Sequence, residues 1–329
     1  MKIAASFLLL FCSLTDNART QPSVIDSTRY FTVHSHYWIN LHHFLYQEAK
    51  GSQQKHLQDD GYALLEIGED SVYNHLTAEE AATMEKAVEY YREHLIDRSL
   101  LRMNDLRVGL QQQDPETPVG GADFSAPFQE ALNGASPVYR RHFWPLHDAR
   151  NRRVYNRHKK MIKIMEESVV DELERVSGDR WPDSRVRIDL TAYANFAGAY
   201  TVDDPRPNSV ISTLDPFSGT TLFIETLFHE GTHLLFIRSS PFRARIYTMS
   251  EEMGMEFPGY LWHICQFYLT GRIVQDLLEQ QDIEHKLLMD VKKIYGTTAD
   301  REFRSILETY YRGNASMDET IRQLLLKIK

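Results

Sequence analysis

The segment that most constrains the fold is GTTLFIETLFHEGTHLLFIR, which spans residues 219–238. Its apolar residues fall on most sides of a helix rather than along one stripe, so this helix must be buried on nearly every side. It nevertheless carries His229, Glu230 and His233 near its middle. A chain that buries such a helix has to surround it with other elements and has to compensate the polar side chains within it.

The residues before this helix predict a small sheet, and most of the remaining chain predicts helices. Three stretches rich in strand-forming residues lie between Gly, Pro, Asn and Asp, at 185–194, 197–202 and 208–215. Helical periodicity is found at 37–50, 77–96, 98–110, 148–176, 258–280, 284–294, 299–312 and 317–328. The helix at 77–96 opens with Thr77 and Glu80, the pattern of a capping box. We therefore expect a helix-dominant α+β fold with a small mixed sheet packed on the buried helix.

The N-terminus predicts export. The stretch MKIAASFLLLFCSL has one lysine and then an apolar run that is typical of a secretory signal peptide and too short for a membrane span. We assign residues 1–20 to this signal, with Ala18 as a candidate for its last residue. Lipidation of Cys12 is the alternative, which the large preceding Phe11 disfavours. The expected location is periplasmic or extracellular.

The mature chain is expected to form one compact unit from two regions, an N-terminal helical region at 21–180 and a region at 181–329 that holds the buried helix. The net charge of −9 lacks the basic footprint of a nucleic-acid-binding protein. The basic stretch at 140–163 is expected to be a solvated helix face. No other apolar stretch is long enough to span a bilayer. Once the signal is removed, Cys265 is the single cysteine, and we expect it to be a buried thiol.

The two histidines of the buried helix have the spacing of metal ligands. His229 and His233 lie four residues apart, so their imidazoles share one helix face and can bind one Zn²⁺ ion. Glu230 is offset by one residue, where its carboxylate can accept a proton from a metal-bound water. Gly231 and Thr232 are small and leave room for a close approach. A cation would also offset the cost of burying these polar groups.

This pattern resembles a known superfamily. FHEGTHLLF is similar to the active-site helix of the zincin metallopeptidases, in which a small sheet precedes the HExxH helix and an edge strand aligns an extended peptide. The stretches LHHFLY, YANFAGAY and LWHICQFYLTG resemble segments of uncharacterised secreted bacterial proteins with a zincin-like helix. The resemblance implies that His229 and His233 are zinc ligands and that Glu230 is the general base.

A catalytic zinc needs a third protein ligand, and the sequence leaves several candidates open. The residue six after His233 is Ser239, so the extended motif of the metzincins is absent. We favour His263, which lies in an otherwise apolar helical stretch. Glu252 is the main rival, because its spacing fits the glutamate-type zincins. Glu251 and Glu256 remain as further possibilities.

Other side chains are candidates for supporting roles. Tyr268 is our choice for a donor to the oxyanion of a tetrahedral intermediate, and Tyr193 and Tyr200 are alternatives. Glu225 lies one turn before His229, so it could orient that imidazole or be a solvated carboxylate. By contrast, His42 and His43 are expected to serve packing or capping rather than metal binding.

These observations predict an exported zinc-dependent hydrolase that acts on a peptide or protein substrate. Two other functions stay open. The chain could be a non-catalytic, metal-containing binding module at the cell surface, although such a module would not need a carboxylate at Glu230. It could also hydrolyse a bond other than a peptide bond, because a fold does not fix its chemistry.

Overall fold

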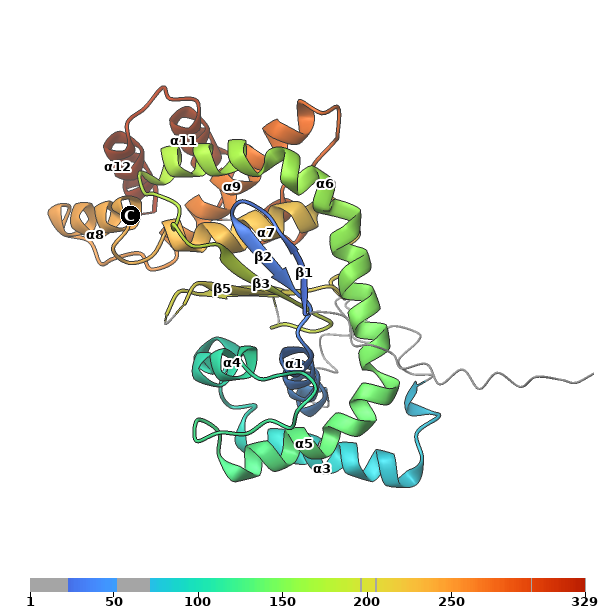
Figure 1. The fold of residues 1–329 in the computed structure, drawn as a ribbon. Coiled ribbons are helices and arrows are strands. Elements are labelled where there is room, and N and C mark those ends of the chain that lie inside the picture. Colours follow the sequence, from blue (N-terminus) through green and yellow to red (C-terminus); the bar gives the residue numbers. More distant parts are fainter. Residues whose placement is uncertain (1–22, 52–71, 196, 205, 297, 329) are drawn as a thin grey trace, which may run out of the picture.

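The chain folds around a five-stranded sheet that lies between two groups of helices (Figure 1). The computed structural model describes residues 23–51, 72–195, 197–204, 206–296 and 298–328. The expected signal peptide at 1–20, with Cys12, lies outside the described residues. No helix within the described ranges is long and apolar enough to cross a membrane.

The elements follow one another in the chain in the order of their labels. The strands are β1 (Val24–Ser27), β2 (Phe31–His34), β3 (Val186–Thr191), β4 (Ala199–Val202) and β5 (Asn208–Ser212). The helices before β3 are α1 (Tyr37–Lys50), α3 (Ala78–His94), α4 (Asn104–Gln111), α5 (Ala126–His142) and α6 (Trp144–Ser177), with a 3₁₀ turn η3 (Leu100–Arg102). The helices after β5 are α7 (Leu222–Thr232), α8 (Pro241–Glu252), α9 (Leu261–Glu279), α10 (Leu288–Val291), α11 (Arg301–Tyr311) and α12 (Met317–Ile328), with a 3₁₀ turn η4 (His233–Leu235).

The sheet is mixed and has the strand order β1-β2-β3-β5-β4. β1 and β2 are antiparallel, β2, β3 and β5 are parallel to one another, and β4 runs antiparallel to β5. Phe31 pairs with Val186 and His34 with Asp189, so a strand from the N-terminal region lies beside a strand from the C-terminal region. The regions 21–180 and 181–329 therefore share one sheet.

Each face of the sheet contributes to a separate hydrophobic core. One core joins α6, α7, α9, α11 and α12 to one face, and the other joins α1, α3, α4 and α5 to the opposite face. The alternation of side chains along the strands separates them, since Ala199 and Ile211 belong to the first core whereas Tyr200 and Val210 belong to the second. The long helix α6 runs along both layers (Figure 1).

Most of the elements expected from the sequence are confirmed. The three predicted strands become β3, β4 and β5, and both hydrogen bonds of the predicted capping box form at Thr77 and Glu80. The helix expected at 98–110 is divided into η3 and α4, and the one expected at 284–294 is reduced to the four residues of α10. The helices α5 and α8 and the strands β1 and β2 were not predicted.

Candidate metal centre

The buried helix predicted from the sequence is α7, which ends in the tighter turn η4. It lies between the sheet and α9, and every residue named in its motif is buried except His233, which is partly exposed. Gly231 permits the close approach of α7 to the sheet side. A Cβ atom at this position would lie 2.6 Å from the Trp181 ring and 3.1 Å from the Phe31 ring. The small residue expected in the motif is thus required by packing.

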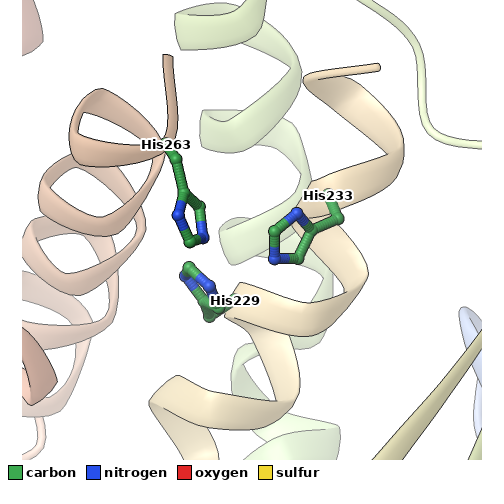
Figure 2. Close-up of side chains that lie close together, drawn as sticks. All are labelled: His229, His233 and His263. Carbon is green, nitrogen blue, oxygen red and sulfur yellow. The ribbon is translucent and has the colours of Figure 1, made fainter. Parts of the chain in front are cut away.

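Three imidazoles converge beside α7. His229 on α7, His233 at the start of η4 and His263 on α9 point toward one another (Figure 2). Each offers one nitrogen, and these nitrogens lie within 4.8 Å of one another. Nitrogen ligands of a tetrahedral zinc ion lie roughly 3.3 Å apart, so small rotations of the rings would close the set around an ion. The structure therefore brings together the two motif histidines and the favoured third candidate.

The three rings are held as neutral groups with free nitrogens. Burial, and then the neighbouring histidines, lower the pKa of His229 well below its ordinary value. Burial is also the main cause that lowers the pKa of His233 to about 3 and that of His263 to about 4. His229 Nδ1 and His263 Nε2 are buried and have no hydrogen-bond partner within the described residues. Unprotonated, unpartnered imidazole nitrogens are what a zinc site requires.

Two neighbours fix the orientation of these rings. The Nδ1 atom of His263 shares a hydrogen bond of 2.7 Å with the hydroxyl of Tyr295. Such a bond on the far side of an imidazole sets its tautomer and directs the other nitrogen. Phe267, one turn after His263 on α9, stacks on the His229 ring with centroids 3.8 Å apart. Tyr295 has a φ of 58°, an uncommon backbone conformation for a tyrosine.

Glu230 lies beside the triad rather than within it. Its Oε2 atom is 4.0 Å from His233 Nε2 and accepts a hydrogen bond of 2.6 Å from the hydroxyl of Thr201 on β4. Burial raises the pKa of Glu230 to about 7, although Thr201 and Lys292 act in the opposite direction. A cation at the triad would favour the charged form of this carboxylate. Glu230 can therefore exchange a proton with a water held next to it.

Glu225 does not orient His229, and it is not solvated either. Its side chain is 1% exposed, and its Oε2 atom accepts hydrogen bonds from His285 Nε2 at 2.7 Å and from the backbone amide of Leu288 at 2.8 Å. His285 also bonds Thr221 through Nδ1 at 2.8 Å. Glu225 thus joins α7 to the segment that follows α9. Both roles considered for it from the sequence are corrected by its complete burial against His285.

Several other candidates lie away from the triad. The hydroxyl of Tyr268, the expected oxyanion donor, donates to Glu308 at 3.0 Å, because Tyr268 follows His263 by five residues and faces α11 instead. Glu252 is on α8, where its half-exposed side chain pairs with Arg245 at 2.9 Å. The structure does not bring either residue to the three histidines.

The remaining polar candidates belong to the second core or to packing. Tyr200 shares a hydrogen bond of 2.7 Å with His43, and His42 shares one of 2.8 Å with Tyr91. The packing role expected for His42 and His43 agrees with these contacts. Tyr193 lies in the same core. Cys265 is fully buried, as expected, and burial raises the pKa of its thiol.

Sequence reasoning missed Tyr295, Thr201 and Phe267. Tyrosine, threonine and phenylalanine are common packing residues, and these three come from separate segments of the chain. The one available signal concerned Phe267, which stands four residues after His263 and so shares its helix face. Nothing in the sequence linked Tyr295 or Thr201 to the motif.

No family model, no curated protein and no solved structure significantly matches this chain. The chemistry of the site has to be judged from its own residues. A set of three neutral histidines fits a zinc ion that keeps one position open for water or substrate. The unpartnered nitrogens of His229 and His263 give this fit its physical basis.

Proposed function

We propose that this protein is a zinc-dependent hydrolase of the zincin type that cleaves peptide bonds after export. The observation that carries the proposal is the convergence of His229, His233 and His263, with the carboxylate of Glu230 beside them and not among them. A site that only held a metal for structure would close its coordination with a fourth protein ligand and would need no such carboxylate.

The zinc ion and the protein's own residues would contribute different parts of the reaction. When bound, a zinc ion supplies a Lewis acid that polarises a carbonyl and makes water acidic near neutral pH. Glu230 accepts the proton of the attacking water and returns it to the leaving nitrogen. Thr201 holds the Glu230 carboxylate through a hydrogen bond of 2.6 Å, and Tyr295 holds the ring of His263. Both contacts keep the reacting groups in one geometry.

The position of β4 supports a peptide as the substrate. β4 is the last strand of the sheet, and Thr201 on this strand contacts Glu230 of the motif. A strand at the edge of a sheet can pair with an extended peptide through backbone hydrogen bonds. A peptide aligned along β4 would pass beside the triad, in keeping with the resemblance to zincins.

The deciding experiment compares the parent protein with Glu230→Gln. We expect about one zinc per chain in both by elemental analysis, because Glu230 is not a ligand. Hydrolysis of a peptide library, followed by mass spectrometry, should fall by roughly 10²- to 10⁴-fold in the variant, since the general base is lost. The double variant His229→Ala, His233→Ala should bind no zinc.

Three results would count against the proposal. Protein that contains no transition metal after reconstitution with zinc is not a metalloenzyme of this kind. Zinc-loaded parent protein that cleaves no peptide in the library would favour the binding module or a hydrolase of another bond. Equal cleavage by the parent and by Glu230→Gln would show that the activity comes from elsewhere.

A further inference from the structure

A cavity of about 230 Å³ opens next to the triad, on the side of His233. Its lining combines Thr201 of β4, the turn from His233 to Arg238, Arg243 of α8 and Trp262 of α9. Trp262 connects the cavity to the metal centre, because its ring lies 5.8 Å from the His233 ring and 5.0 Å from the His263 ring. A molecule held at the triad therefore extends naturally into this cavity.

Arg243 is a cation without a counter-ion among the residues that the structure describes. Its guanidinium lies 4.3 Å from the centre of the Trp262 ring, and Nη1 donates a long hydrogen bond of 3.4 Å to the carbonyl of Phe236. Its Nε atom is buried and has no partner, and Arg243 forms no ion pair with any described residue. Burial is the main cause that lowers the pKa of Arg243. A half-buried cation in this state lacks the acceptor that normally compensates it.

The contrast with Arg245, two residues later on the same helix, is clear. Arg245 bonds Asp318 and Glu252 and points out to solvent-exposed partners. Arg238, at the mouth of the cavity, is exposed and likewise forms no ion pair within the described part of the chain. Asp203 also lines the cavity, and its charge raises the pKa of Arg243, but the two side chains do not form an ion pair. The cavity thus has excess positive charge beside the expected reaction centre.

We infer that this cavity binds the free C-terminal carboxylate of a peptide substrate, so that the enzyme removes the last residue of the chain. The inference rests on the proposed function and specifies its substrate class. Arg243 offers a planar pair of N–H donors that match a carboxylate. The Trp262 ring contacts both the Arg243 guanidinium and the rings of His233 and His263, so a carboxylate held by Arg243 would lie near a bond held at the triad.

The size of the cavity limits the released residue. The cavity has room for one side chain of moderate size, and its lining mixes apolar residues such as Trp262 with polar ones such as Thr201. In the reaction one water is consumed and the last C–N bond breaks. The carbonyl carbon gains the hydroxyl and becomes a carboxylate, and the nitrogen takes a proton and leaves as the amine of the free amino acid.

Binding can be tested without turnover, in protein stripped of metal with a chelator. Three probes share acetyl-Leu and differ in the last residue or its terminal group: acetyl-Leu-Phe with a free carboxylate, acetyl-Leu-Phe-amide, and acetyl-Leu-Glu-amide, which carries its carboxylate on a side chain. The readout is the indole N–H signal of Trp262 in nitrogen-labelled protein, assigned with Trp262→Phe. We expect the free acid to bind at least about tenfold more tightly than either amide.

Variants of Arg243 test whether this residue causes the preference for the free acid. In Arg243→Gln the free acid should lose its advantage over the amides, and in Arg243→Lys part of it should remain because a point charge is kept. Arg245→Gln is the matched control and should behave like the parent. The comparison of probes on the parent protein stands even if an Arg243 variant fails to fold.

Each outcome separates this inference from the proposed function. Three results would overturn the carboxylate site. These are equal binding of the acid and the amide, no shift of the Trp262 signal at millimolar peptide, or a loss of the acid's advantage in Arg245→Gln that equals the loss in Arg243→Gln. Tight binding of acetyl-Leu-Glu-amide would assign the site to an acidic side chain and overturn the removal of the last residue. Zinc-loaded protein that cleaves internal bonds and ignores the C-terminus would leave a peptidase but refute this substrate class. Selective binding of the free acid without any hydrolysis would support the cavity and refute the peptidase.

Discussion

His263 is the residue on which the proposed metal site depends most. It is the only ligand candidate contributed by α9, and its removal would leave two imidazoles of α7 and η4. We expect His263→Ala to bind zinc far more weakly than the parent, by several orders of magnitude in the dissociation constant, because a catalytic zinc needs three protein ligands. Competition with a fluorescent chelator measures this loss.

Glu252→Ala provides the matched control, because Glu252 pairs with Arg245 on α8 and does not reach the triad. Its zinc affinity should equal that of the parent. A normal affinity in His263→Ala combined with a loss in Glu252→Ala would mean that the chain rearranges to use the glutamate.

The residues of the site could be predicted where their spacing along a helix shows which side chains share one face. The spacing of His229, Glu230 and His233 determines which of them share a face, and His263 stood out as a lone histidine on an apolar helix. The choice of Tyr268 failed as a geometric guess, because five residues on a helix turn the side chain to another face. Tyr295 could not be chosen, since only tertiary packing brings it to His263.

At the scale of elements, the close packing of α7 against its neighbours depends on the absence of a side chain at Gly231. Gly231→Ala would place a Cβ atom 2.6 Å from the Trp181 ring, so the helix or the ring must shift. We expect this variant to lose about 1–3 kcal/mol of unfolding free energy, which is typical of overpacking. Urea denaturation followed by circular dichroism measures the change, and zinc binding should weaken with it.

Gly134→Ala is the counterpart on α5, where nothing lies within 4 Å of the added Cβ atom. Here the substitution should stabilise the protein by about 0.5–1 kcal/mol, because alanine favours a helix. If both variants lost stability equally, the close contact at Gly231 would not be the cause.

The strands β1 and β2 and the helix α5 were missed for different physical reasons. β1 and β2 have four residues each, and their pairing with each other and with β3 depends on contacts that the local sequence does not show. α5 contains Gly134 and Pro137, residues that usually interrupt a helix, and it is held by the second core instead. Long or strongly patterned elements such as α3, α6 and α9 were found because their own sequences favour them.

At the scale of the whole molecule, stability should depend on pH through buried histidines, including four that are remote from the proposed metal site. Burial lowers the pKa of His34, His36 and His43 to about 4 and that of His42 well below its ordinary value. In the unfolded chain each would take up a proton near pH 6.5. Between about pH 4 and 6.5 the unfolded state therefore binds more protons, and the folded state loses stability as the pH falls.

The free energy of unfolding should change by up to about 1.4 kcal/mol per pH unit for each such histidine. Urea unfolding in the presence of a chelator, measured from pH 8 to pH 5, reveals it. Stability should be nearly constant above pH 7 and should decline below it, whereas Asp189, whose pKa lies at about 2, stays charged throughout. His94→Gln, at an exposed position, should leave the profile unchanged. A flat profile down to pH 5 would contradict the buried neutral state.

The parallel pairing of β2 with β3 also means that β2 is synthesised well before its parallel partner. About 150 residues separate His34 from Val186, and a ribosome that adds roughly 5–20 residues per second needs on the order of 10 s to make them. During that interval β2 can pair with β1, but its other edge lacks β3, and Phe31 and Val33, fully buried in the finished protein, lack that part of their core. An unpaired apolar edge is a template for wrong association. Protection of β2 during synthesis should therefore affect the yield of folded molecules.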